Sequence, residues 1–336
     1  MGGTLDLATF YYPLRHLSPV TFNMAIGLRT RVALKPYRKG WIKVSSRGFD
    51  SAQFPADLAP FEHPLGLMFA TASYFGAAGV HIHIDSSSPP RGALGGSSAA
   101  AVALAAAFSS LTEAHKTGAA FGPRALALLV HQIEQSVAGV PCGLQDQLAA
   151  AYGGVNLWHW HADPGRPVFK KQVVVRKKGF KALKRHLLLA YCGNPHVSKD
   201  INGRWVRQFL AGKHRELWEQ IISCTRQFAV ALGHGEYRQA GDCMNRETDI
   251  RRKMTPDVLD KMGKKLVRLA VQNHCGARFT GAGGGGCLWA LGDVENIDRL
   301  KPLWEKALSA HRHAGLLDAV IDSQGVGAAP AAPGER

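Results

Sequence analysis

The chain has 336 residues, of which 46% are hydrophobic, and a formal net charge of +16 at pH 7. This length can bury a large core and favours about two domains. No stretch approaches about 18 uninterrupted apolar residues, and the first residues lack a signal-peptide pattern, so we expect a cytoplasmic protein without membrane association. The six cysteines include no C-x-x-C pair, which argues against a zinc site or a disulfide framework.

Hydrophobic patterns predict an α+β fold in two halves, residues 1–163 and 164–324. Elements of the first half are strands at residues 22–34 and 80–84 and helices at 96–110 and 123–137. Elements of the second half are a buried strand at 187–191, long helices at about 204–232 and 256–275, and a strand at 287–291. Residues 325–336 lack core-forming side chains and are predicted to be a disordered tail.

The densest basic run lies between Lys170 and Arg185. Residues 173–175 within it are typical of a strand, and no aromatic side chains interleave as nucleic-acid stacking would require. We favour a solvated basic face. Steering of anionic substrates and nucleic-acid binding are the alternatives, and the latter predicts steep salt-dependent retention on DNA or RNA.

A glycine-rich turn, P-P-R-G-A-L-G-G-S-S-A-A, occupies residues 89–100 and runs directly into an alanine-rich helix. Glycines let backbone N–H groups approach an anion, and the positive end of the helix dipole faces the same point. Ser97 and Ser98 fall in the first turn, where a hydroxyl can cap the backbone or reach Mg²⁺. The segment predicts a phosphate cradle that is not a P-loop, because no lysine follows the last glycine. The alternative is a tight strand-to-helix connection with serine caps.

A second glycine-rich segment, R-F-T-G-A-G-G-G-G-C-L-W-A, spans residues 278–290. Alone it would be a flexible hairpin loop. Together the two segments resemble the P-x-x-x-G-L-G-S-S-A-A and T-G-A-G-x-G-G loops of the GHMP kinase superfamily. The resemblance implies a two-subdomain fold, with an N-terminal half like ribosomal protein S5 domain 2 that binds ATP and a ferredoxin-like C-terminal half. It also implies transfer of phosphate from ATP to an alcohol, with Mg²⁺. The residues expected to bind ATP are Arg91, Gly92, Ala93, Leu94, Gly95, Gly96, Ser97 and Ser98.

Among the acids between these loops in the sequence, Glu134 and Asp146 suit the chemistry of phosphoryl transfer. Phosphoryl transfer needs a carboxylate to hold Mg²⁺ and a group that orients or deprotonates the acceptor. Without the glycine loops, the two would be a surface glutamate and a loop-capping aspartate. With them, the segment resembles the superfamily pattern I-E-(x)₁₁-D-Q-(x)₅-G-G. This implies that Glu134 joins Ser97 or Ser98 on Mg²⁺ and that Asp146 is the catalytic residue facing the acceptor hydroxyl.

Further segments resemble the heptose kinases of this superfamily. They are G-G-T-L-D at residues 2–6, Q-D-Q at 145–147, N-M-A-I-G-L-R at 23–29 and the loop C-G-N-P-H-V-S at 192–198. The resemblance implies a heptose 7-phosphate acceptor, phosphorylated at its anomeric oxygen for nucleotide-activated heptose and surface polysaccharide synthesis. The alternative acceptor is another sugar, such as galactose or fucose. The implied acceptor-binding residues are Thr4, Asp6, Gln145, Asp146, Gly281, Ala282, Gly283, Gly284, His196 and Ser198.

The chain departs from that family pattern in two places. A preceding strand with a basic residue is missing before Gly2, so we expect that the start is truncated or that another strand fills the edge, with Arg15 or Arg29 as the substitute cation. In addition, Arg91-Gly92-Ala93 replaces an expected G-x-G. The missing start supports one alternative from a different class, a catalytically silent sensor of nucleotide and sugar, whereas the presence of Glu134 and Asp146 opposes it. The expected partners are ATP and a sugar or sugar phosphate, with neither nucleic acid nor membrane and with a homodimer left open.

Overall fold

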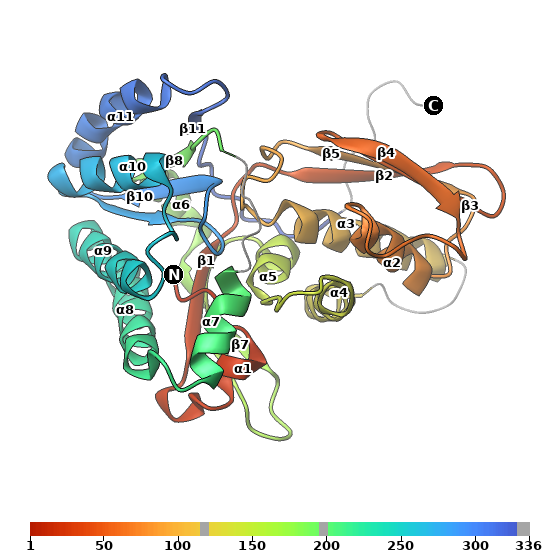
Figure 1. The fold of residues 1–336 in the computed structure, drawn as a ribbon, viewed down its shortest axis with the longest axis horizontal. Coiled ribbons are helices and arrows are strands. Elements are labelled where there is room, and N and C mark those ends of the chain that lie inside the picture. The colour runs from red at the N-terminus through yellow and green to blue at the C-terminus, as the bar shows by residue number, and fades with distance from the viewer. Residues whose placement is uncertain (115–120, 195–200, 328–336) are drawn as a thin grey trace.

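The computed structural model describes residues 1–114, 121–194 and 201–327. Figure 1 shows two lobes, one around the sheet that contains β2–β5 and the other around β8 and β10. The strands are β1 (Val20–Met24), β2 (Thr30–Pro36), β3 (Trp41–Ser46), β4 (Phe49–Pro55), β5 (Val80–Ser86), β6 (Val155–Trp160), β7 (Phe169–Val175), β8 (Leu187–Tyr191), β9 (Gly276–Phe279), β10 (Cys287–Leu291) and β11 (Gly315–Leu317). This mixed architecture confirms the α+β prediction.

Helices cover these sheets. They are α1 (Ala8–Tyr11), α2 (Gly66–Tyr74), α3 (Gly96–Ala114), α4 (Pro123–Val137), α5 (Gln145–Tyr152), α6 (Phe180–Lys184), α7 (Ile201–Leu210), α8 (Arg215–His234), α9 (Tyr237–Met254), α10 (Lys261–Gln272) and α11 (Val294–Leu308), with short 3₁₀ turns η1 (Arg15–Leu17) and η2 (Lys177–Gly179). Among the described residues, no helix is both long and apolar enough to cross a membrane.

The described strands form three sheets, in the orders β2-β5-β3-β4, β1-β6-β7 and β11-β8-β10-β9. In β5, Ile82 and Ile84 are buried while His83 and Asp85 are exposed, which is the period-two pattern of a strand with one face in the core. The buried face packs against α2 and α3 through Phe69 and other apolar side chains. The strand predicted at residues 80–84 is therefore confirmed.

Two predicted elements are each divided in the structure. Residues 22–34 form β1 and β2, which belong to different sheets, because residues 25–27 hydrogen-bond to Gly154, Val320 and Asp322 instead of continuing one ladder. The helix predicted at 204–232 is α7 and α8, interrupted where Gly212 (φ 76°) and His214 (φ 62°) adopt left-handed backbone.

The helices of the second lobe differ from the prediction in two respects. The helix predicted at 256–275 is shorter in the structure, because the carboxylate of Asp260 caps the start of α10 by accepting from the Gly263 N–H at 2.7 Å. The helix α9 has no counterpart among the predicted elements.

The predicted tail begins as ordered structure. Gly325 lies directly on the backbone of α5, where a Cβ would come within 1.9 Å of the Ala151 carbonyl oxygen. Val326 is partly buried against the apolar cluster of the first lobe. The disorder prediction is thus wrong for residues 325–327, because this close backbone approach anchors them, and residues 328–336 lie outside the described part of the chain.

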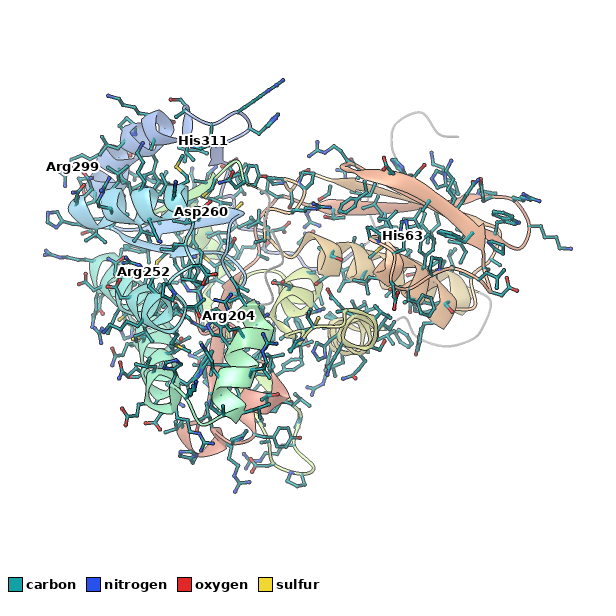
Figure 2. All side chains as sticks on the ribbon, viewed as in Figure 1. His63, Arg204, Arg252, Asp260, Arg299 and His311 are labelled. Atoms are coloured by element: carbon teal, nitrogen blue, oxygen red, sulfur yellow. The ribbon has the colours of Figure 1, made fainter. Side chains whose placement is uncertain are left out.

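The basic run lies at the surface, as the favoured interpretation expects. All of its cationic side chains belong to exposed residues, namely Lys170, Lys171, Arg176, Lys177, Lys178, Lys181, Lys184 and Arg185. Lys184 forms an ion pair with Asp318 at 2.7 Å. Figure 2 shows further cations at the surface of the second lobe, among them Arg252 on α9 and Arg299 on α11.

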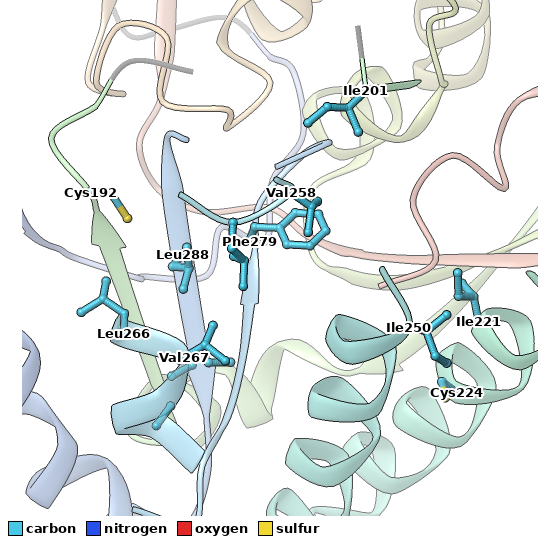
Figure 3. Close-up of a cluster of buried hydrophobic side chains, with 14 of the residues drawn as sticks. Cys192, Ile201, Ile221, Cys224, Ile250, Val258, Leu266, Val267, Phe279 and Leu288 are labelled. Atoms are coloured by element: carbon cyan, nitrogen blue, oxygen red, sulfur yellow. The ribbon is translucent and has the colours of Figure 1, made fainter. Parts of the chain in front are cut away.

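The core of the second lobe reaches into the N-terminal segment. Figure 3 shows part of this core, with side chains such as Ile221, Ile250, Val267 and Leu288 from helices and strands of the lobe. Leu5 and Phe10 belong to the same buried cluster. Residue 163, the predicted boundary between the halves, lies in the hairpin that joins β6 to β7 within one sheet. The boundary itself stays a prediction.

Candidate active site

The first glycine-rich turn leads into α3 through strained backbone. Arg91 (φ 54°), Ala93 (φ 56°) and Gly95 (φ 68°) all have left-handed φ values, which are uncommon for residues other than glycine. The turn is closed by the Gly92 N–H, which donates to the Pro89 carbonyl at 3.0 Å. α3 begins at Gly96, so its first N–H groups lie immediately after the turn. This is the geometry expected of an anion cradle.

The second glycine-rich loop packs directly against the first. Its ends are held together because both the N–H and the hydroxyl of Thr280 donate to the Cys287 carbonyl, at 3.0 and 3.1 Å. A Cβ on Gly286 would lie 2.7 Å from the Gly92 oxygen, and one on Gly281 would lie 3.4 Å from the Cβ of Ala93. The two loops that the sequence singles out are therefore neighbours in space.

A cavity of about 280 Å³ lies beside the first loop. Residues from β1, α3, α5, the second loop and the C-terminal segment line it, including Asn23, Ala99, Asp146, Arg278 and Gln324. The cavity therefore joins the first glycine-rich loop to Asp146.

Glu134 on α4 lies beside the start of α3. Its Oε2 atom accepts from the Ser98 hydroxyl at 2.8 Å and from the Gln147 side-chain amide at 2.6 Å. Burial raises the pKa of Glu134, while these two donors and His131 oppose the rise. Of the two serines proposed from the sequence, Ser98 contacts Glu134, and Ser97 is exposed.

Asp146 lies against the first glycine-rich turn. A Cβ on Gly95 would come within 2.8 Å of the Asp146 Cγ, so only glycine allows the loop to approach this carboxylate so closely. Asp146 is half-buried, and burial together with the negative charges of Glu134 and Asp6 raises its pKa to about 7. A carboxyl group with such a pKa can exchange a proton near neutral pH.

Asp6 completes a group of three neighbouring carboxylates. Its Oδ2 accepts from the Gln145 N–H at 3.0 Å, while its buried Oδ1 has no hydrogen-bond partner among the described residues. A Cβ on Gly143 would lie only 1.9 Å from Asp6 Oδ2, so Gly143 lets the Asp6 carboxylate approach the backbone before α5. Burial raises the pKa of Asp6.

The other predicted acceptor-binding residues differ in their burial and contacts. Thr4 is buried, and its hydroxyl donates to Asn202 Oδ1 at 3.2 Å. Gln145 faces Gly3, where a Cβ would lie 3.2 Å from its amide nitrogen. In the second loop, Gly281 is exposed, Ala282 and Gly284 are partly buried, and Gly283 is buried. His196 and Ser198 lie outside the described residues.

Each of the predicted substitute cations pairs with an aspartate. Arg15 is exposed and pairs with Asp163 at 3.4 Å. Arg29 lines the cavity and pairs with Asp322 through two short contacts, 2.6 and 2.7 Å. The edge of β1 is paired at Phe22 with Met1, and just beyond β1 Ile26 bridges to Ile321.

Several residues near the site were not identified from the sequence. Gln147 was visible only as part of the Q-D-Q pattern, whereas its contact with Glu134 depends on the packing of α4 against α5. The buried group formed by Glu247, Arg251 and Arg278 combines an i,i+4 pair on α9 with a cation from β9. Only the i,i+4 spacing is readable from sequence.

The oxygen donors of Ser98 and Glu134 suit Mg²⁺, which usually takes one or two carboxylates together with substrate phosphates. Among the described residues, no group of three or more His, Cys, Asp or Glu side chains could hold a metal by itself. The residues present therefore fit a cation whose remaining ligands come from phosphate and water.

Residues 64–154 match the family described as "GHMP kinases N terminal domain". A mevalonate kinase from Thermococcus sibiricus is 27% identical over 292 residues, which cover 80% of this chain and 81% of that protein. A probable glucuronokinase 2 from Arabidopsis thaliana is 29% identical over 212 residues, or 60% of this chain and 54% of that protein.

Solved structures of similar fold include a D-glycero-D-manno-heptose 1-phosphate kinase from Bacteriodes thetaiotaomicron. It has a TM-score of 0.71 and 16% identity, with 96% of this chain and 93% of that chain covered. A Lactococcus lactis galactokinase complexed with galactose has a TM-score of 0.67 and 17% identity, with 92% and 89% covered.

The named relatives are kinases, which supports the expectation of an ATP-dependent phosphotransferase acting on an alcohol. The heptose kinase is one of the similar structures, whereas most of the similar sequences are named mevalonate kinases. Residues 64–154 thus match the N-terminal domain of the GHMP kinases, and the chain has the fold of the GHMP kinase superfamily.

Proposed function

We propose that this chain transfers the γ-phosphate of ATP to a hydroxyl of a sugar phosphate, with Asp146 as the catalytic residue. The observation that carries the proposal is the position of Asp146, which lies against Gly95 of the anion cradle and close to the buried carboxylate of Asp6. A carboxylate that lies between the phosphate site and the acceptor site can orient the acceptor hydroxyl for the transfer.

The remaining roles follow from the contacts around Asp146. The N–H groups of residues 93–98 would cradle the triphosphate, and Ser98 with Glu134 would hold Mg²⁺. The chemistry that Mg²⁺ supplies when bound is neutralisation of charge on the transferred phosphate. The second glycine-rich loop would bring its backbone over that phosphate from the side of Gly281. Asp146 would hold the acceptor hydroxyl in line and take its proton.

The unpartnered carboxylate oxygen of Asp6 indicates which class of molecule receives the phosphate. Its buried Oδ1 lacks a donor, and a polyhydroxylated acceptor supplies O–H donors there. Heptose 7-phosphate, phosphorylated at its anomeric oxygen, is the first candidate, supported by the similar structure named as a heptose kinase. The buried Arg278 lines the cavity and shares Glu247 with Arg251, so this group carries one excess positive charge that favours an anionic acceptor.

Mevalonate is a second candidate, because mevalonate kinases are among the relatives that cover 80% of the chain. Mevalonate also carries an anionic group, but it offers fewer hydroxyl donors than a sugar does to the carboxylates of Asp6 and Asp146.

A coupled ADP-release assay with an acceptor panel tests the proposal. The panel contains heptose 7-phosphate, free heptose, galactose, fucose, mannose and mevalonate. We expect the highest kcat/KM for heptose 7-phosphate. A preference for a free sugar or for mevalonate would refute this acceptor while retaining the kinase. A thermal shift with ATP, but no turnover on any acceptor in the panel, would favour the silent sensor.

A further inference from the structure

The first turn of α5 sends three consecutive side chains toward three different parts of the site. Gln145 faces Gly3 of the N-terminal segment, Asp146 faces Gly95 of the phosphate loop, and Gln147 contacts Glu134 of α4. Successive residues of a helix point about 100° apart, which allows one turn to serve three directions. Gln145 and Asp146 already have proposed roles at the site, whereas Gln147 does not.

The contact of Gln147 with Glu134 is close and shielded from solvent. Gln147 is 1% exposed, and its Nε2 donates to Glu134 Oε2 at 2.6 Å. The Ser98 hydroxyl donates to the same oxygen at 2.8 Å. Both donors therefore act on one carboxylate oxygen, and the orientation of the carboxyl group about its Cγ–Cδ bond is fixed from two sides.

A role in packing alone does not explain an amide at this position. The Oε1 atom of Gln147 is buried and has no hydrogen-bond partner among the described residues. An unpartnered buried carbonyl oxygen is unfavourable, so an apolar side chain of the same length would fill the space better. Unlike an apolar side chain, the amide provides an N–H donor to Glu134.

We propose that Gln147 is a positioning residue that holds the carboxylate of Glu134 in the orientation needed to bind a divalent cation together with ATP. This inference rests on the proposed function, because it takes Glu134 as a cation ligand. Gln147 acts through Glu134 and does not itself touch ATP or the acceptor. Partners that orient a ligating carboxylate typically change metal affinity about 10–100-fold when removed.

The test compares Gln147→Met with wild type. Methionine keeps the unbranched shape but lacks the N–H donor. Gln147→Leu, with a different apolar shape, separates loss of the donor from a change of packing. The matched control is Gln172→Met on β7, an exposed glutamine whose side-chain oxygen contacts His159. ATP affinity is measured by calorimetry with and without Mg²⁺, and the Mg²⁺ concentration for half-maximal rate is measured in the ADP-release assay.

We expect both Gln147 variants to bind ATP without Mg²⁺ like wild type, which also shows that they are folded. The gain in ATP affinity on adding Mg²⁺ should fall about 10-fold or more, and the half-maximal Mg²⁺ concentration should rise to match. Gln172→Met should show neither change. Much of the lost rate should return at saturating Mg²⁺, which a general loss of structure would not allow.

Glu134→Gln separates the failure of this inference from failure of the proposed function. Wild-type Mg²⁺ dependence in Gln147→Met, together with lost dependence in Glu134→Gln, overturns only the role of Gln147. Wild-type Mg²⁺ dependence in Glu134→Gln overturns the assignment of Glu134 as a cation ligand, and the inference with it.

Discussion

Two groups of buried or half-buried charged side chains differ in whether their carboxylates are paired with cations. In the group of Glu247, Arg251 and Arg278, one carboxylate accepts from two guanidinium groups, with contacts of 3.1 and 2.5 Å. Burial alone would raise the pKa of Glu247, but Arg278 and Arg251 outweigh it and hold that pKa well below its usual range. In the group of Asp6, Glu134 and Asp146, burial and mutual repulsion raise the pKa of Asp146 to about 7.

This difference in pairing indicates that the group of Glu247, Arg251 and Arg278 is structural, whereas the carboxylate group belongs to the candidate active site. The ion-paired group ties distant segments together, since Glu247 on α9 pairs with Arg278 on β9 and Arg251 Nη2 donates to the Gly3 carbonyl at 2.6 Å. Gly3 lies shortly before Asp6, and Arg278 begins the second glycine-rich segment. The carboxylate group lacks such compensation, and a perturbed carboxyl beside a cavity is typical of a reactive centre. The first group therefore holds in place the segments that surround the second.

Removing Glu247, the carboxylate of the ion-paired group, should have the largest effect on stability. Glu247→Ala leaves two buried guanidinium groups without their partner, so we expect a loss of roughly 3–5 kcal/mol in the free energy of unfolding. Urea denaturation measures this loss. The control is Asp249→Ala on the same helix, whose ion pair with Arg252 is exposed and is worth about 1 kcal/mol or less. Equal losses in the two variants would show that the buried group is not a scaffold.

Gly95→Ala should disturb the group of Asp6, Glu134 and Asp146 without affecting the ion-paired group. Its Cβ would enter the space of the Asp146 side chain at 2.8 Å, and the left-handed backbone adds strain. We expect the kcat of phosphoryl transfer to fall about 10–100-fold, as for a misplaced catalytic group. Gly165→Ala is the control, since Gly165 has a similar φ of 77° but open space around its Cβ. A Gly95→Ala rate no lower than that of the control would contradict the close contact.

The smallest expected effect is a pH-dependent gain in stability from Asp146→Asn. Because folding raises the pKa of Asp146, its ionisation is more costly in the folded chain than in the unfolded chain. The contribution of Asp146 to the free energy of unfolding therefore falls as pH rises from about 4 to about 7. The asparagine variant lacks this pH-dependent loss of stability. Its melting temperature should exceed that of wild type by a few degrees at pH 8 and approach it near pH 4.5. A difference in melting temperature that does not change with pH would contradict the raised pKa.

Local sequence signals were sufficient for some elements of the fold. The bounds of α4, β8 and β10 coincide with the predicted ranges 123–137, 187–191 and 287–291. α4 has a proline in its first turn, and the residues of β8 are all buried, so each carries its signal within its own sequence. The break between β1 and β2 carries no such local signal, because it depends on pairing with residues some 300 positions later.

In the candidate site, too, some features could be predicted from local sequence patterns and others depend on contacts between distant segments. The sequence patterns indicated both glycine-rich loops, Glu134 and Asp146, and the structure brings these together. It also distinguishes Ser98 from Ser97, because only one face of the first turn of α3 meets α4. The departure from the family pattern before Gly2 suggested Arg15 as a substitute cation, yet Arg15 pairs with Asp163. The presence of a cationic residue in the sequence does not by itself locate a binding residue.

The most direct test of the central claim is the turnover of Asp146→Asn in the ADP-release assay, with the preferred acceptor and ATP both saturating. The account predicts a fall of about 10²–10³ in kcat, corresponding to about 3–4 kcal/mol of lost transition-state stabilisation. ATP affinity, measured in parallel by calorimetry, should stay within a few-fold of wild type. Turnover like that of wild type in Asp146→Asn would contradict the assignment of Asp146 as the catalytic residue.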